Sequence, residues 1–226
     1  AYLGVPTVPL PANETAVAHD PDGATAYPSR QFGWGILGAE LARIKLLPYV
    51  LLISVVMSGG VLILSNFLML YLNIDMALTL PGIAILLACL AVPVLVLGLP
   101  LGHAADRWGT RNAVRLSLTV SALMIWLIPS CRSLSTLAPL ATILILSHIL
   151  GTPAWLAVIS QLAPTARRGG VMALVATGEG VGAVLGPLLG GRLWDMHHSW
   201  VFYGSGALLS IAAVLAFTVL PKLPSV

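Results

Sequence analysis

The stretch GHAADRWGTR, residues 102–111, carries one acid and two arginines between two long apolar segments. Only 8% of the residues of this chain are charged, so the stretch concentrates charge. A carboxylate that precedes a helix accepts hydrogen bonds from its free N–H groups, and glycine permits tight turns and close approach. If the two apolar segments cross a membrane, the arginines lie at the depth of the lipid headgroups and can bridge to a neighbouring helix end or to phospholipid. The stretch therefore suits a connection that holds helices together. The residues concerned are Gly102, Asp106, Arg107, Gly109 and Arg111.

Glu179 is a second candidate for chemistry, because it is an acid inside an apolar segment. A carboxylate in a membrane helix costs about 2.5–3.5 kcal/mol on insertion scales and usually faces a cavity or a partner. At about 100° per residue, Glu179 lies on the same side of a helix as Gly182 and Gly186, so it faces the packed side and not lipid. It is either an acid that carries a proton or a cation, or a structural acid bonded to a neighbouring helix or to water. Weaker candidates for the same path are Asn66, His148, Trp155 and Gln161.

The composition predicts a membrane protein. The chain has 226 residues, of which 58% are apolar, and its mean hydropathy is +0.97. A soluble domain carries about 25% charged residues. The net charge of +3 does not predict nucleic-acid binding, because the basic residues form no stripe with aromatic residues. Cys89 and Cys131 are far apart and predict neither a disulfide framework nor a metal site, and no cofactor is expected.

Six apolar segments are each long enough to cross a bilayer, which takes about 20 residues per helix. None alternates apolar and polar residues as a membrane β-barrel does. We therefore expect an all-α membrane protein, with a polar leader or linker over residues 1–45 and a short tail over residues 222–226. The expected spans are approximately 46–72, 78–101, 112–129, 134–162, 170–193 and 199–221.

The basic residues predict the orientation of these spans. If the amino end is cytoplasmic, all but two of the 11 lysines and arginines lie on the cytoplasmic side, the exceptions being Arg132 and Arg192. We therefore expect a multi-pass protein of the plasma (inner) membrane with both ends in the cytoplasm. Residues 102–111 are then the cytoplasmic connection between the second and third spans.

This connection resembles the signature loop of the major facilitator superfamily, G-x-L-A-D-R-x-G-R-K, with Ala104 and Thr110 as departures. In that family the acid and the arginine latch neighbouring helices on the cytoplasmic side and bias the inward/outward equilibrium. The resemblance therefore implies that Asp106 and Arg107 are gate residues and not substrate ligands.

The segment 176–195 carries a glycine at every fourth position, which predicts a stripe along one helix face where a second backbone can approach closely. It also resembles the G-x-x-x-G-P-x-x-G-G core of a motif in the fifth helix of the same family, best known from antiporters. Ala173 stands where that motif expects a further glycine. Simple helix packing without transport accounts for the glycines equally well. The residues of the stripe and motif are Gly178, Gly182, Gly186, Pro187, Gly190 and Gly191.

The family fold has two six-helix halves around a central site, and this chain resembles one half over residues 46–221. The segment 147–153 lacks the arginine and glutamine common in the first half, and the leader resembles an inter-half linker, so the carboxy-terminal half is favoured. The glycine-proline motif points to the other half. The implied function is alternating-access transport of a small solute by a secondary, efflux-type carrier, with proton coupling through Glu179 as a hypothesis. The implied partners are the substrate, the bilayer, and the missing half or a second copy.

Two alternatives stay open. A rhomboid-like intramembrane serine hydrolase needs a serine in a G-x-S-G setting and a membrane histidine. Ser205 lies in Tyr-Gly-Ser-Gly, which lacks the first glycine, and His148 is its plausible partner. The other alternative is a non-transporting module left by truncation. The expectation is that the protein is not an enzyme.

Overall fold

The computed structural model describes residues 46–162 and 168–220, apart from the side chains of residues 99 and 104–106. Within this part the backbone forms α-helices and one turn of 3-10 helix, with no strand. Six helical segments of the described part are long and apolar enough to cross a membrane, so the predicted all-α membrane fold is confirmed. The predicted leader and tail lie outside the described residues. The elements are α2 (Leu47–Ile74), α3 (Leu80–Trp108), α4 (Thr110–Leu127), η2 (Ile128–Ser130), α5 (Leu134–Leu162), α6 (Arg168–Met196) and α7 (Trp200–Val219).

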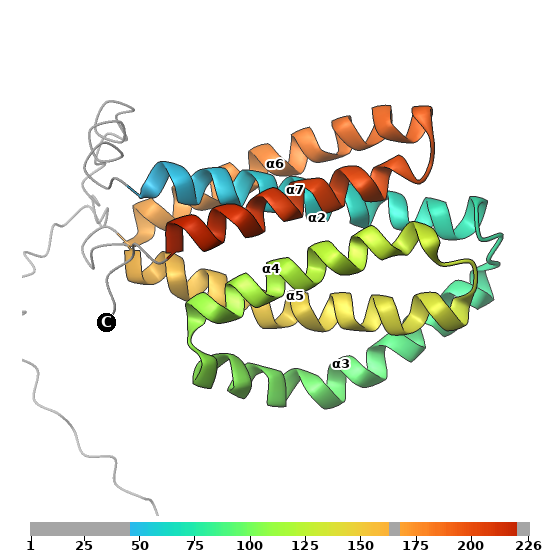
Figure 1. Cartoon of the computed structure of the whole chain (residues 1–226), viewed down its shortest axis with the longest axis horizontal. Coiled ribbons are helices and arrows are strands. Elements are labelled where there is room, and N and C mark those ends of the chain that lie inside the picture. Colours follow the sequence, from blue (N-terminus) through green and yellow to red (C-terminus); the bar gives the residue numbers. More distant parts are fainter. Residues whose placement is uncertain (1–45, 163–167, 221–226) are drawn as a thin grey trace, which may run out of the picture. The chain divides into compact units, whose positions relative to one another are not determined.

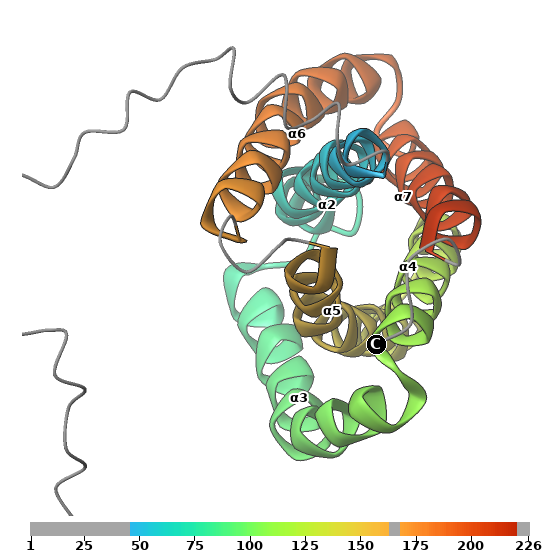
Figure 2. The ribbon, with the colours of Figure 1, turned by 90° about the vertical axis from the view of Figure 1, so that its left-hand side faces the viewer.

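The helices form two groups that meet along α4 and α7. The first group is α2 with α6 and α7, and the second is α5 with α3 and α4. Figure 2 shows the two groups on opposite sides of the bundle when it is viewed along the helices. Contacts between α4 and α7 join them.

The basic residues of the described part divide between the two ends of the bundle. Consecutive helices run in opposite directions, so the α3–α4 turn and the start of α6 lie at the same end as the start of α2 (Figure 1). This end, called the basic end below, carries Arg107, Arg111, Arg115 and Arg168. Arg132 and Arg192 lie toward the other end, called the far end.

The connection predicted over residues 102–111 is shorter in the structure. Helix α3 continues past Pro100 to Trp108, and α4 starts at Thr110, so Gly109 alone makes the turn. Its φ of +83° is a backbone conformation that L side chains rarely adopt, which accounts for a glycine there. Gly109 is also the N-cap of α4, in place of the expected Asp106, and a glycine has no side chain with which to cap the helix. Pro100 lies inside α3, and a proline within a membrane helix is tolerated when its surroundings satisfy the backbone groups that it leaves without a hydrogen bond.

Buried side chains hold α2 against α7. The aromatic rings of Tyr71 and Phe202 meet edge to face with centroids 4.7 Å apart, and Phe202 is fully buried. Ser205 Oγ donates a hydrogen bond of 2.7 Å to the carbonyl oxygen of Gly60. These contacts fix α2 as a helix that α6 and α7 both pack against.

Aromatic and charged side chains join α2 to α6 at the far end. Phe67 stacks on Trp194 with centroids 5.6 Å apart, and Trp194 stacks on His198 at 4.1 Å. His198 Nδ1 lies 2.9 Å from a carboxylate oxygen of Asp75, just beyond α2. The α2–α3 connection and the α6–α7 turn are therefore linked across this end.

Candidate functional site

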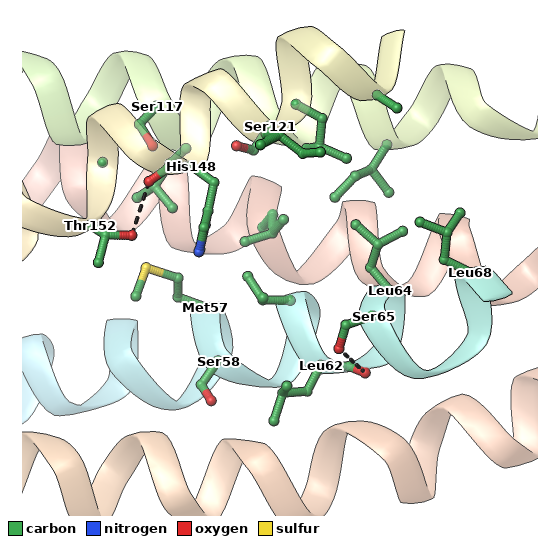
Figure 3. A pocket seen from close by; sticks show the side chains of 18 of the residues that line it. Met57, Ser58, Leu62, Leu64, Ser65, Leu68, Ser117, Ser121, His148 and Thr152 are labelled. Atoms are coloured by element: carbon green, nitrogen blue, oxygen red, sulfur yellow. Dashed lines mark hydrogen bonds between the residues drawn. The ribbon is translucent and has the colours of Figure 1, made fainter. Parts of the chain in front are cut away.

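The bundle contains a partly open cavity of about 630 Å³ between its two groups of helices. Its walls come from α2, α3, α4 and α5, with Glu179 from α6 and Leu209 from α7. Small-molecule sites have volumes of about 300–1,000 Å³ and mostly apolar walls with a few polar groups. Figure 3 shows leucine and methionine side chains of α2 facing serines of α4 and the histidine of α5 across this space.

The side chain of His148 is a polar group of the cavity wall. It extends from α5 toward Met57 and Ser58 on α2 (Figure 3). Thr152, one turn later on α5, donates from its hydroxyl to the backbone carbonyl of His148 at 2.9 Å. His148 itself is exposed, as expected for a group that faces open space.

Trp155 is part of the same wall but is almost completely covered, with 3% of its surface exposed. Its indole nitrogen Nε1 is buried and has no hydrogen-bond partner among the described residues. A buried donor without an acceptor costs free energy, so buried indole groups usually find a partner. The indole N–H is therefore a free donor beside the cavity.

Glu179 contributes the acid of the cavity wall, on the side formed by α6. Ser58 of α2 donates from its hydroxyl to the backbone carbonyl of Glu179 at 2.8 Å, which joins the two helices at this level. The carboxylate of Glu179 has no hydrogen-bond or ion-pair partner among the described residues. The structure therefore brings an unpaired acid into the same cavity as His148 and Trp155.

Two residues predicted for this path do not line the cavity. Asn66 is exposed and donates from its side-chain amide to the carbonyl of Leu62 in its own helix, at 2.7 Å. Gln161 is exposed near the end of α5. Of the residues predicted for this path, Glu179, His148 and Trp155 therefore line one cavity. Asn66 and Gln161 do not line it.

Sequence reasoning missed the hydroxyl groups of the cavity. Ser117 and Ser121 of α4 both line it, and Ser121 shares a buried hydrogen bond of 2.7 Å with Ser147 of α5. Their spacing of four residues places them on one helix face and was a signal available in the sequence. Ser58 follows another serine, Ser54, at the same spacing, yet only Ser58 of that pair lines the cavity, and Thr152 has no hydroxyl residue at this spacing.

The glycine stripe of α6 lies against α2. Gly178, Gly182, Gly186 and Gly190 are all buried on this face. A Cβ added at Gly186 would lie 2.5 Å from the carbonyl oxygen and 2.9 Å from the Cα of Gly59, and one at Gly182 would clash with the carbonyl oxygen of Val55. The two backbones are therefore in direct contact. Pro187 is half-buried, and a Cβ at Gly191 would meet no atom within 4 Å.

The residues of the signature loop are spread along the end of α3 and the start of α4. Arg107 is exposed, and Arg111 is partly buried at the start of α4. A Cβ at Gly102 would meet nothing within 4 Å, so the expected close approach of a neighbouring helix at this glycine is wrong for the described residues. The side chain of Asp106 lies outside the described part.

The serine of the hydrolase alternative occupies a packing position. Ser205 is fully buried, and its hydroxyl donates to Gly60 as described above. It is not among the residues of the cavity wall, whereas His148 is. The structure does not bring this serine and this histidine together as a nucleophile and its base. Within the described residues, no three histidine, cysteine, aspartate or glutamate side chains gather as metal ligands.

Six helices of the described part that are long and apolar enough to span a membrane, with a mostly apolar cavity among them, place the chain in the class of multi-pass membrane proteins. The sequence profile of the Major Facilitator Superfamily matches residues 50–226. The chain belongs to this family, and the resemblance drawn from its sequence motifs is confirmed.

The chain is also similar to the "Uncharacterized MFS-type transporter Rv1250" of Mycobacterium tuberculosis (strain ATCC 25618 / H37Rv). The two sequences are 31% identical over 141 residues, which is 59% of this chain and 23% of the relative. The matched part of the chain thus spans about a quarter of the length of that relative. Both comparisons support a role in membrane transport.

Proposed function

We propose that this chain forms one half of a secondary transporter that moves a small solute across the membrane by alternating access. The observation that carries the proposal is the cavity, which lies inside a bundle of spanning helices and contains Glu179, an acid whose carboxylate has no partner among the described residues. An acid within a membrane span is by default a candidate for a transport pathway. Membership in the family supports the same function.

We further propose that a second six-helix unit, either the missing half or a second copy of this chain, completes the transporter. The spans of α3 and α6 are the least covered, with 17% and 22% of their apolar windows buried, whereas each other span is 44% buried. The sequence between residues 147 and 153 favours the carboxy-terminal half. In the plasma membrane, the basic end would face the cytoplasm, as its arginines favour. Residues 106–111 would then be placed to latch this half to its neighbour.

Accessibility of cavity residues from the two sides of the membrane tests alternating access without knowledge of the solute. In a background with Cys89→Ser and Cys131→Ser, Leu64→Cys and Ser117→Cys place single thiols in the cavity wall. A membrane-impermeant maleimide should label each thiol from either side of oriented vesicles. The control, Trp200→Cys at the exposed start of α7, should react from one side only. Labelling of the cavity thiols from a single side would reject alternating access.

Efflux coupled to protons through Glu179 is the finer part of this proposal. The glycine-proline motif of α6 supports the efflux type. The Glu179 carboxylate, which has no partner among the described residues, supports proton exchange, because a bound proton removes the cost of its charge within the membrane. Transport by the full-length protein should lose its pH dependence in Glu179→Gln. It should keep that dependence in Asp195→Asn, which makes the same change on the exposed end of the same helix. An unchanged pH dependence in Glu179→Gln would reject coupling through this residue.

A further inference from the structure

Among the described residues, the cavity wall contains one acid and no fixed positive charge. Of the described residues that line it, only Glu179 and His148 carry titratable side chains, and none is a lysine or an arginine. The described residues offer the Glu179 carboxylate no donor and no cation. A charge taken out of water normally needs a partner, so this carboxylate lacks the compensation that buried charges have.

Most hydroxyl groups of the wall are already occupied by hydrogen bonds within the protein. Ser58 donates to Glu179, Thr152 to His148, and Ser121 shares its hydrogen bond with Ser147. A ligand with many hydroxyl groups, such as a sugar, would leave most of them unpaired against leucine and isoleucine side chains, which is unfavourable. The wall therefore selects ligands with a large apolar surface and few polar groups.

The uncharged residues of the wall leave room for a positive charge near Glu179. Met57 lines the cavity from α2, and its thioether is polarisable. The ring of Trp155 is only 3% exposed, so it contributes little to this preference. A bound anion would be repelled by the Glu179 carboxylate. The described residues of the wall include no lysine or arginine that would offset this repulsion.

We infer that the cavity binds lipophilic organic cations, whose charge is balanced by Glu179 and whose apolar body contacts the leucines and methionines of α2, α3 and α5. The inference rests on the proposed function, which makes this cavity the solute site, and it adds the chemical class of the solute.

Tetraphenylphosphonium and tetraphenylborate test this class, because they share one tetraphenyl shell and carry opposite charges. Binding of each ion to the full-length protein is measured by equilibrium dialysis in a neutral detergent. The cation should bind more tightly than the anion by on the order of tenfold or more, as expected for a desolvated charge pair. Equal or tighter binding of tetraphenylborate would overturn the inference without any variant being made.

Substitutions at residue 179 then locate the site. Glu179→Gln should weaken binding of tetraphenylphosphonium on the order of tenfold or more, and Glu179→Asp should restore most of that loss because it keeps the charge. Asp195→Asn, the matched change at an exposed position of α6 outside the cavity, should leave binding unchanged. Unchanged cation binding in Glu179→Gln would also overturn the inference.

The failure of this inference is distinguishable from failure of the proposed function. If the cavity thiols react from both sides while the cation shows no preference over the anion, alternating access stands and the substrate class is wrong. If the cation binds through Glu179 while the thiols react from one side only, the binding site stands and alternating access is wrong.

Discussion

Helix α2 has one side against α6 and another side on the cavity, and the two sides are built differently. Toward α6 its backbone at Val55 and Gly59 directly touches the glycine stripe, and side chains such as Ile63 pack against that stripe farther along. Toward the cavity, side chains such as Leu64 and Leu68 extend into open space (Figure 3). The same helix therefore packs tightly against α6 on one side and borders the cavity on the other.

The difference follows from how helices associate in lipid. Lipid tails are as apolar as leucine, so contact between helices depends on close van der Waals packing, which small residues allow. The α2–α6 contact therefore fixes the position of α2, while its other side can keep a cavity without loss of the bundle. Substitutions should separate the two sides, with large effects on stability at the contact and small effects at the cavity.

Gly186→Val should have the largest effect. Even a Cβ at this position approaches the backbone of Gly59, and a valine adds two more carbons, so the helices must separate along their length. We expect a loss of more than about 4 kcal/mol of unfolding free energy, at the extreme of single substitutions. The thermal unfolding transition of the protein in lipid nanodiscs measures this loss.

Gly191→Val is the control for that experiment. It makes the same change of helix propensity in the same helix, five residues later, where an added Cβ meets no atom within 4 Å. Its unfolding transition should stay close to that of the unmodified protein. Similar losses in both variants would show that helix propensity, and not backbone contact, determines the effect.

The neighbouring residues Ile63 and Leu64 sharpen the comparison, because each belongs to one side of α2. Ile63 is 1% exposed and lies within 3.4 Å of an added Cβ at Gly190, whereas Leu64 lines the cavity. Ile63→Ala should cost about 2 kcal/mol or more, because it opens a void in a packed contact. Leu64→Ala should cost less than about 1 kcal/mol, because no new void forms beside existing space. Equal losses of unfolding free energy for the two variants would contradict the division of α2 into two sides.

The sequence predicted the elements of the fold better than their ends. Long apolar segments predicted all six spanning helices, because bilayer thickness determines the length of a span. The connection over residues 102–111 was predicted too long, since Pro100 and the charged residues suggested an end to α3 that the helix does not have. A proline removes only the hydrogen bond of its own missing N–H and disturbs the preceding turn, so a helix can continue past it, and the residue types alone do not say whether it does.

The candidate site was predictable only in part. The cost of a carboxylate in lipid pointed to Glu179, and the structure places this residue on the cavity wall. Asn66 had the same appearance in the sequence, yet its amide bonds to its own helix outside the cavity. Helical periodicity gives the side of a helix on which a residue lies. It does not say which side faces a cavity, because that depends on how α2, α4 and α5 pack together.

The smallest effect is expected at the far end of the α2–α6 contact, where side chains replace glycines. The carboxylate of Asp75 and the ring of His198 form a pair of partly exposed groups, with 32% and 37% of their side chains accessible. Solvent-exposed ion pairs contribute about 0.2–1 kcal/mol. Asp75→Asn should lower the unfolding free energy by about 0.5 kcal/mol, and less at high salt.

A double-mutant cycle of Asp75→Asn with His198→Gln measures the coupling free energy of this pair, and Asp195→Asn serves as the matched control on an exposed carboxylate. The stacking of His198 on Trp194 also contributes, so His198→Gln alone should cost more than Asp75→Asn alone. A coupling free energy above about 2 kcal/mol would exceed the range for exposed pairs. The far end would then contribute to the contact between α2 and α6 about as much as the packing of Ile63 does, and the backbone contact would share this role with exposed side chains.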